Sequence, residues 1–393
     1  MRRTGDQFMV KEINTSIVMD TIIRYHSISR ARISEITGLN KGTVSSLVFE
    51  LINQQLVYET GAGASSGGRK PVMLQFNGDT GYVVGVDLGV NYILTILTNL
   101  QGLIISEHHV DITGLNSQEV IPLLVQSIGI VCSHAPSSPY GIVGIGIGVP
   151  GMVDSEGTVL FAPNLGWTHV DLREAIQVNY PHMPIFVDNE ANMGAIGEKQ
   201  YGAGKEVTNL IYISVGIGIG AGIILKNEVF RGTSGYSGET GHMTIDAEGK
   251  LCRCGNRGCW ELYASEQALS EVGKSILPEG AIATLDSYIA LAEAGQASML
   301  EAFEKIGYYL GIGVANIMNI FNPDLIIIGN RLANAEKWLA HSLQQTIVQR
   351  ALPISRQSAK IQFSSLSSHS TALGASFMAV SAFLEKSTSS IRT

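Results

Sequence analysis

The chain of 393 residues has few cysteines and no long apolar run. Four cysteines are too few for a disulfide framework in a chain of this length. No apolar run approaches the roughly 18–20 residues that cross a bilayer. The first twelve residues also lack the continuous apolar stretch of a signal peptide. We therefore expect a soluble, cytoplasmic protein with no membrane partner.

Charged residues are also scarce, at 15% of the chain, whereas 45% of it is hydrophobic. Such a chain can bury a large core in two or three domains. Its charge is unevenly distributed, because residues 1–76 hold 9 lysines and arginines against 6 acidic residues, while the remainder holds 17 against 28. A basic head on an acidic body predicts an anionic partner for the head alone.

Residues 1–76 have the pattern of three helices followed by a hairpin. Apolar residues recur at helical spacing in residues 10–26, a short second helix ends at Gly38, and Asn40 can cap a third helix. Two β-rich runs follow, separated by the tip GAGASSGGRKP. This order predicts a winged helix-turn-helix domain.

The third helix of this head carries small polar side chains opposite its apolar stripe, as expected of a helix that reads a major groove. Basic side chains on the second helix, the third helix and the hairpin tip are placed to meet phosphates or a minor groove. The predicted DNA contacts are Arg30, Arg32, Lys41, Thr43, Ser45, Ser46, Arg69 and Lys70. A helical dimerisation module with a solvated polar face is the alternative. The turn, the wing and the charge together favour double-stranded DNA.

The body that follows the head is duplicated in pattern. Residues 81–90 and 210–225 are both β-rich runs with a Gly-rich loop, and a further strand covers 141–151. Amphipathic stretches such as 170–180 and 301–321 alternate with these strands. We therefore predict an α/β body of two lobes, with ligands in the cleft at the carboxyl ends of the strands.

Three of the four cysteines fall within eight residues. Cys252, Cys254 and Cys259 follow His242 in the segment GETGHMTIDAEGKLCRCGNRGCWELYAS. One histidine and three cysteines form the closed tetrahedral site that zinc favours, and a reducing compartment keeps such thiols free. Three unligated core cysteines are the alternative, which the surrounding Gly, Arg and Asn disfavour. A closed site leaves no position for water, so we expect a structural Zn²⁺ that holds the loop.

Polar residues in four separate loops predict a small polyhydroxy ligand. Glu239 and Glu261 flank the predicted metal residues, and rigid carboxylates recognise sugar hydroxyls, which both donate and accept. Two further segments, FVDNEANMGAIGE and APNLGW, supply Asn189, Glu190, Asn164 and Trp167. Singly, each is more often a cap or a surface residue. Together, at strand ends and beside a metal-braced loop, they favour a sugar.

These motifs resemble the ROK family of repressors, open reading frames and sugar kinases, over the whole chain. The loop at Asp87, the segments PNLGW and DNEAN, Glu-x-Gly-His at 239–242 and the cysteine run at 252–261 follow in family order. The resemblance implies an actin-like or hexokinase-like two-lobed body behind the winged helix-turn-helix domain. The expected boundaries are a head at 1–76, a first lobe at 77–190 joined by the C-terminal helix 371–393, and a second lobe with the zinc loop at 191–370.

By position, the resemblance also implies the site residues. The sugar contacts would be Asn164, Asn189, Glu190, Glu239, His242 and Glu261, and the zinc ligands His242, Cys252, Cys254 and Cys259. His242 would hold the metal through one ring nitrogen and a sugar hydroxyl through the other.

The head and the segment GCWELYASE resemble in particular the xylose-responsive repressors of Gram-positive bacteria. This implies D-xylose as inducer, a palindromic operator of a xylose-utilisation operon, and at least a homodimer. Glucose or an amino sugar is the alternative inducer.

Three departures from the family's kinases argue against ATP chemistry. DLGVNY stands where kinases have Asp-x-Gly-Gly-Thr, so Val90 crowds backbone that would approach phosphate. Ile217 replaces the Thr of Gly-Thr-Gly, and Glu190 replaces the general-base Asp, which moves the carboxylate by about one C–C bond. We expect no ATP and no catalytic residue. A sugar kinase with a DNA-binding head, or a sugar-binding protein whose head contacts only proteins, are the alternatives.

Overall fold

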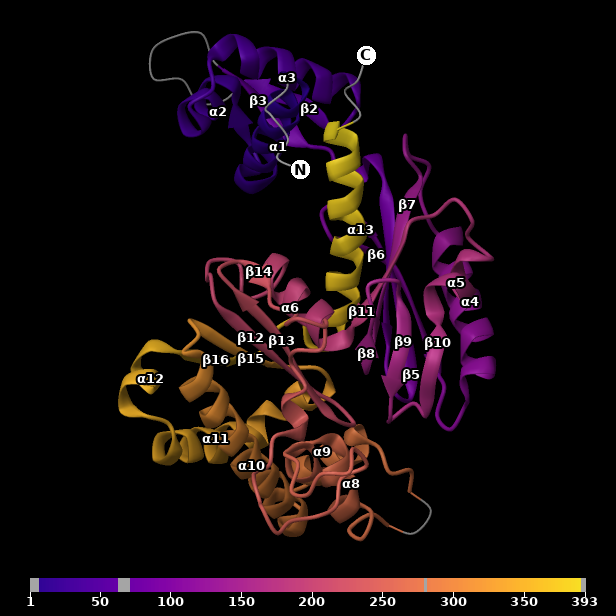
Figure 1. Cartoon of the computed structure of the whole chain (residues 1–393), viewed down its shortest axis with the longest axis vertical. Coiled ribbons are helices and arrows are strands. Elements are labelled where there is room, and N and C mark those ends of the chain that lie inside the picture. The colour runs from indigo at the N-terminus through magenta and orange to yellow at the C-terminus, as the bar shows by residue number, and fades with distance from the viewer. Residues whose placement is uncertain (1–6, 63–70, 279–280, 390–393) are drawn as a thin grey trace.

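The computed structural model describes residues 7–62, 71–278 and 281–389 of the chain. These residues form a small head and a body of two α/β lobes, with the head at the top of Figure 1. Helix α13 (Ser370–Ser389) runs from the body to the head. Among the described residues, every helix is too short or too polar to cross a bilayer.

The head consists of three helices and a small sheet in the strand order β1-β3-β2. Its elements are α1 (Gln7–Tyr25), β1 (Ile28–Ser29), α2 (Arg30–Thr37), α3 (Lys41–Asn53), β2 (Val57–Ala62) and β3 (Val72–Phe76). The three helices and the hairpin predicted from the sequence are confirmed, whereas the two-residue strand β1 was not predicted. Residues 63–70 of the predicted hairpin tip, with Arg69 and Lys70, lie outside the described residues, and the first two residues of that tip belong to β2.

Local capping determines where the helices α2 and α3 meet. The Ser29 side chain accepts a hydrogen bond from the Arg32 N–H at 3.3 Å, and Gly38 ends α2 at a φ of 72°, which glycine adopts without strain. The Asn40 side chain accepts from the Thr43 N–H at 2.8 Å, so the predicted cap is confirmed. The apolar stripe of α3 is buried and consists of Val44, Leu47, Val48 and Leu51. The opposite face of α3 is therefore turned to solvent.

The first lobe is built on a five-stranded sheet in the order β11-β7-β4-β5-β6. The strands are β4 (Tyr82–Leu88), β5 (Tyr92–Asn99), β6 (Ile104–Asp111), β7 (Ile142–Val149) and β11 (Ile185–Asn189). The remaining elements are η1 (Gly78–Thr80), α4 (Ser117–Ser133), α5 (Leu172–Gln177) and a second, antiparallel sheet of β8 (Met152–Val153), β9 (Thr158–Ala162) and β10 (Trp167–Asp171). Helix α4 packs on β5 and β6. Of the amphipathic stretch 170–180, only six residues are helical, because β10 continues to Asp171, whose side chain caps α5.

The second lobe repeats the sheet of the first, in the order β14-β13-β12-β15-β16. Its strands are β12 (Leu210–Val215), β13 (Ile219–Leu225), β14 (Glu228–Val229), β15 (Leu325–Gly329) and β16 (Lys360–Phe363). Its helices are α6 (Glu190–Gln200), η2 (Thr240–His242), α7 (Glu261–Ala264), α8 (Glu266–Gly273), α9 (Leu285–Glu293), α10 (Ala297–Phe321), η3 (Arg331–Ala335), α11 (Glu336–Arg350), α12 (Pro353–Ser358) and η4 (Ser367–His369).

The two sheets share one topology. In each, three antiparallel strands are followed by two strands that run parallel to the first. The predicted duplication is therefore confirmed. The run 210–225 is a hairpin whose Gly-rich loop lies between β12 and β13 rather than after the last strand.

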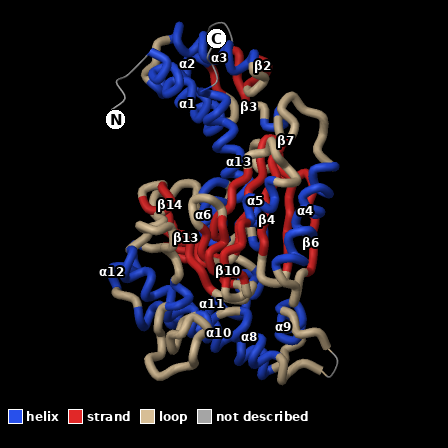
Figure 2. Tube along the Cα trace, turned by 45° about the vertical axis from the view of Figure 1, so that its right-hand side comes forward, coloured by secondary structure: helices blue, strands red, loops and turns tan. Residues whose placement is uncertain are grey.

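Helices α6 and α13 connect the lobes with each other and with the head. Helix α6 packs on β12, β13 and α13, and α13 packs on β4 and β7. At Gly85 of β4 a Cβ would overlap the carbonyl oxygen of Ala372, so only glycine lets α13 lie this close to the sheet. At the other end of α13, Ala379 and Val380 share a hydrophobic cluster with Val18 of the head. Figure 2 shows this helix continuing from the body strands to the head helices.

Candidate ligand cleft and metal centre

The strand ends of both lobes open onto one cleft. Its walls include the loop 89–92 after β4, the loop 216–218 between β12 and β13, and the end of β11. All six predicted ligand residues line it: Asn164, Asn189, Glu190, Glu239, His242 and Glu261. The space that the centre of a water molecule can occupy within the cleft is about 70 Å³. Because one water needs roughly 10–15 Å³ by this measure, the cleft has room only for a small molecule.

Asn189 and Glu190 stand at the start of α6. The side-chain oxygen of Asn189 accepts from the N–H groups of Ala191 and Asn192 at 2.8 and 3.3 Å, so it caps the helix. Its amide nitrogen donates to the carbonyl of Gly151 at 2.9 Å. Both polar atoms of the Asn189 side chain thus form hydrogen bonds to the backbone. The main role of this residue is therefore to stabilise the wall of the cleft.

The Glu190 side chain is hydrogen-bonded to Ser214, a residue of the second lobe that Asn330 supports in turn. Its Oε1 accepts from the Ser214 hydroxyl at 3.2 Å, and Ser214 in turn accepts from the Asn330 amide at 2.9 Å. Burial, together with the charges of Asp87 and Glu239 and against the Ser214 hydrogen bond, raises the pKa of Glu190 to about 8. At neutral pH the group is therefore largely protonated, and it can donate as well as accept.

An aromatic side chain lies across the first Gly-rich loop. The Tyr92 hydroxyl donates to Oδ2 of Asp87 at 2.7 Å, and a Cβ at Gly89 would overlap the Tyr92 ring. The Arg331 guanidinium lies 5.9 Å from the centre of that ring and 3.4 Å from the Glu266 carboxylate. The loop that the sequence predicts to have lost phosphate binding is thus packed against protein side chains.

We expect the buried carboxyl of Asp87 to make stability fall as the pH rises. Burial raises its pKa to about 7, whereas the Tyr92 hydrogen bond and His369 lower it. The folded chain therefore keeps a proton that the unfolded chain has released, and the free energy of unfolding falls between about pH 4 and pH 7. Thermal unfolding of ligand-free protein across this range should show a shallower decline for Asp87→Asn, by at most about 1.4 kcal/mol per pH unit. An identical pH slope in the variant would contradict the assignment.

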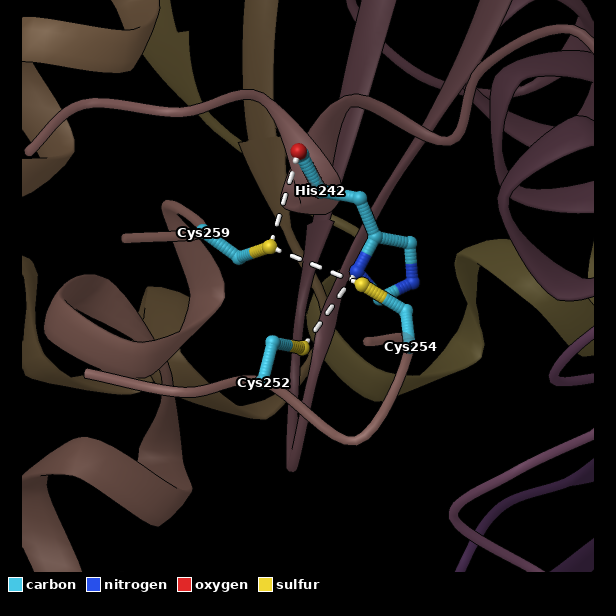
Figure 3. Close-up of side chains that lie close together, drawn as sticks. All are labelled: His242, Cys252, Cys254 and Cys259. Carbon is cyan, nitrogen blue, oxygen red and sulfur yellow. Dashed lines mark hydrogen bonds between the residues drawn. The ribbon is translucent and has the colours of Figure 1, made fainter. Parts of the chain in front are cut away.

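The predicted metal ligands converge on one point. The ligand atoms of His242, Cys252, Cys254 and Cys259 all lie within 4.8 Å of one another. Figure 3 shows the three sulfur atoms around the imidazole ring. Cys254 Sγ lies 3.7 Å from Cys259 Sγ, and Cys252 Sγ lies 3.7 Å from His242 Nδ1. A tetrahedral ion with metal–sulfur bonds of about 2.3 Å would set sulfur atoms about 3.8 Å apart, so the cluster fits such an ion.

The histidine joins this cluster to the cleft. Its Nδ1 faces Cys252, and its Nε2 lies 3.9 Å from Oε2 of Glu239 on the cleft side. Glu261 Oε1 lies 3.5 Å from Nδ1 and accepts from the Cys252 thiol at 3.3 Å. Burial raises the pKa of Cys252 to about 12, so a bound cation is needed to hold it as a thiolate at neutral pH.

The metal loop is anchored to the core of the second lobe by Trp260. This side chain is fully buried, its indole N–H donates to the Tyr309 carbonyl at 2.8 Å, and a Cβ at Gly313 would overlap its ring. Thr244 and Cys259 pair as an isolated bridge across the loop. The loop therefore holds Glu239 and Glu261 between a core anchor and the cysteine cluster.

In the head, four of the predicted contact residues that the structure describes lie on α3. Lys41, Ser45 and Ser46 are exposed and Thr43 is half-buried. The two arginines of α2 already have carboxylate partners within the head, Arg30 with Glu59 and Arg32 with Glu35, each at 2.7 Å. Sequence reasoning missed Phe49, which is 62% exposed on α3.

One residue expected in the cleft lies elsewhere, and the cleft contains residues that were not predicted. Trp167 is 2% exposed and packs in the core of the first lobe instead of lining the cleft. Asn330 and Arg331 line the cleft and were not predicted, although they follow an apolar strand, the same signal that identified Asn189. Tyr92 was missed because nothing in its sequence neighbourhood indicates that its ring lies back over the loop.

Comparison with known proteins agrees with this architecture. The sequence profile of the ROK family matches residues 83–382. A xylose repressor of Bacillus spizizenii is 44% identical over 381 residues, covering 97% of this chain and 98% of that protein. The crystal structure of a ROK family transcriptional regulator, described as a homologue of the Escherichia coli MLC protein, has a TM-score of 0.80 at 30% identity and covers 96% of this chain and 98% of that one.

A ROK family glucokinase from Streptomyces griseus, solved with glucose and AMPPNP, has a TM-score of 0.69 at 27% identity. It covers 76% of this chain and 98% of its own. The family profile spans both lobes, and the cleft and the cysteine cluster stand where the motifs placed them. The chain therefore belongs to the ROK family.

Proposed function

We propose that the protein is a transcriptional repressor that binds a palindromic operator through its head and leaves it when a monosaccharide binds the cleft. The convergence of six polar side chains from separate loops on one small cleft carries this proposal. The exposed face of α3 supports DNA as the head's partner. The 44% identical relative is named a xylose repressor, which supports D-xylose as the inducer and a xylose-utilisation operon as the target.

A sugar suits the cleft because its hydroxyl groups both donate and accept hydrogen bonds. Carboxylates, an imidazole and the Asn164 amide supply partners of both kinds within one cleft. The metal that His242 and the three cysteines would hold is zinc, since a soft set of three thiolates and one imidazole favours that ion. With all four positions taken by protein, it would brace Glu239 and Glu261 and supply no reaction step.

Helix α13 connects the cleft to the head. The hydroxyl of Thr371 on α13 donates to the carbonyl of Glu190 at 3.2 Å, and the far end of α13 packs into the head core. A change in lobe closure would therefore move the heads of a homodimer relative to each other. A sugar that binds one closure state better shifts the population away from the spacing that fits two half-sites.

Lys41 is a candidate phosphate contact at the start of α3. We expect Lys41→Ala to weaken binding to any DNA sequence and to reduce the slope of log affinity against log salt by about 0.9, the effect of one lost phosphate contact. The matched control is Lys360→Ala, which removes an exposed lysine from the second lobe. If both variants keep the wild-type slope, Lys41 makes no phosphate contact.

The proposal is tested by fluorescence anisotropy of the full chain on promoter DNA of a xylose-utilisation operon at fixed salt. D-xylose, D-glucose and N-acetylglucosamine are titrated separately into the complex. Release by D-xylose supports the repressor and its inducer together. If only another sugar releases the DNA, that sugar and not D-xylose is the inducer. If the protein binds none of the promoter DNA, it is not a repressor of this operon.

A sugar kinase is the second candidate, favoured by the likeness to the glucokinase solved with glucose and AMPPNP. Val90, Ile217 and the Tyr92 ring oppose it, because they crowd both loops that would approach phosphate. Sugar-dependent release of ADP from ATP by the purified chain would establish this activity in place of our proposal.

A further inference from the structure

We infer that Arg231 is a positioning residue for the sugar response, because its ion pair with Asp188 holds the two lobes together beside the cleft. The inference rests on the proposed function and concerns a residue that acts through its neighbours. Asp188 lies on β11 of the first lobe, and Arg231 follows β14 of the second. Nη1 of the guanidinium lies 2.5 Å from Oδ2 of Asp188.

Asp188 is fixed at the wall of the cleft that the first lobe provides. Its Oδ1 accepts from the Asn192 amide at 3.2 Å and from the N–H of Asn189 at 2.7 Å. The next two residues along the chain, Asn189 and Glu190, line the cleft. Only 13% of the Asp188 side chain is exposed, so Oδ2 meets Arg231 in a partly desolvated place.

Arg231 belongs to a strap, the segment 230–238, which leads from β14 to Glu239. Both ends of the strap are hydrogen-bonded to β13, through the N–H of Phe230 and the carbonyl of Gly238. The residue that follows the strap, Glu239, lines the cleft from the second lobe. The ion pair therefore connects the end of β11 to the strap, and with them the two walls of the cleft.

The cleft is complete only when both walls are in place. Among the predicted ligand residues, Asn164 lies between β9 and β10 of the first lobe, whereas Glu239 and Glu261 belong to the second. A sugar can contact these side chains together only when the lobes are apposed as in this structure. An ion pair between the lobes stabilises this arrangement over one in which the lobes lie further apart.

Loss of the ion pair should therefore weaken sugar binding and leave operator binding intact. A repressor favours its operator-binding arrangement when no sugar is present, so only a small fraction of the chains is competent to bind sugar. The apparent sugar affinity is proportional to that fraction, whereas nearly all chains are already competent to bind operator. A variant that is merely misfolded would lose both activities.

The test is calorimetric titration of D-xylose into full-length wild type, Arg231→Gln, Asp188→Asn and the double variant. We expect each single change to weaken xylose binding about 2- to 5-fold, the range for a partly exposed ion pair, and the double variant to lose no more than that. Operator affinity without sugar should stay at the wild-type value. Arg231→Lys keeps the charge and should recover part of the lost affinity. Wild-type xylose affinity in Arg231→Gln, or single effects that add in the double variant, would overturn the inference.

Arg350→Gln is the matched control. The guanidinium of Arg350 donates to the Tyr308 hydroxyl at 2.8 Å, a contact that lies within the second lobe. This variant makes the same chemical change as Arg231→Gln without touching a contact between the lobes. It should bind xylose like the wild type, and a loss equal to that of Arg231→Gln would overturn the inference.

Salt provides a second measurement. D-xylose carries no charge, so salt acts on its affinity through the charges of the protein. The Arg231 side chain is 39% exposed, and at about 1 M salt the screening length falls to about 3 Å. We expect the wild-type xylose affinity to fall between about 0.1 M and about 1 M salt, and Arg231→Gln to change less. Equal salt dependence in the two proteins would overturn the inference. Failure of the proposed function is distinguishable, because it appears in the wild type as operator binding that D-xylose does not relieve.

Discussion

Glu239→Gln should bind operator like the wild type and fail to release it at sugar concentrations that empty the wild-type complex. Oε2 of Glu239 lies 3.9 Å from His242 Nε2 on the cleft side of the metal loop, so both atoms can meet the same ligand hydroxyl. Hydrogen bonds to a charged carboxylate contribute about 1.5–3 kcal/mol, which corresponds to a rise of roughly 10- to 150-fold in the xylose concentration for half-release. The xylose concentration for half-release is measured by the anisotropy of the operator complex during a xylose titration.

Glu248→Gln is the matched control, since it makes the same chemical change at an exposed position of the same loop. It should leave the xylose titration unchanged. If Glu239→Gln releases operator at the wild-type xylose concentration, Glu239 does not bind the inducer.

Loss of one metal ligand should have the second large effect. We expect Cys254→Ser to abolish bound zinc and the sugar response together, because apparent zinc-binding free energies of about 10–16 kcal/mol depend on the complete ligand set. Cys254 is exposed, so the substitution leaves no cavity behind. Zinc per chain by mass spectrometry and xylose-dependent operator release are the two measurements.

The remaining cysteine provides the control for this experiment. Cys132 lies on α4 of the first lobe, away from the cluster, and Cys132→Ala should keep zinc and response. One equivalent of zinc and full response in Cys254→Ser would show that Cys254 is not a required ligand. Wild-type protein without zinc would exclude the proposed ion.

Features that depend on neighbouring residues were predictable from the sequence. The ends of α2 and α3 follow from Gly38 and Asn40, because left-handed backbone and side-chain caps are local effects. The four-ligand cluster followed from spacing, since three cysteines in eight residues have few other roles in a reduced protein. The place of Glu190 in the cleft followed from its position at the carboxyl end of β11, whereas Asn164 and Glu239 lie in loops of other sheets, and it was the family motifs that placed them.

Features that depend on packing between distant segments were not predictable. Trp167 looked like a ligand residue because of its neighbours in the chain, yet the core of the first lobe buries it. Tyr92 and Arg331 meet from different lobes, and no spacing in one chain reports such a contact. The close approach of α13 to Gly85 likewise depends on a helix about 290 positions further along the chain.

The measurement that tests the central claim most directly is the affinity of the protein for D-xylose with and without saturating operator DNA. If cleft and head are coupled, operator weakens xylose binding by the same factor by which xylose weakens operator binding, and couplings of this kind are typically about 5- to 150-fold. Our account predicts equal factors within this range, determined by calorimetry and anisotropy on the same preparation. A xylose affinity that operator leaves unchanged would show that the cleft does not control the head.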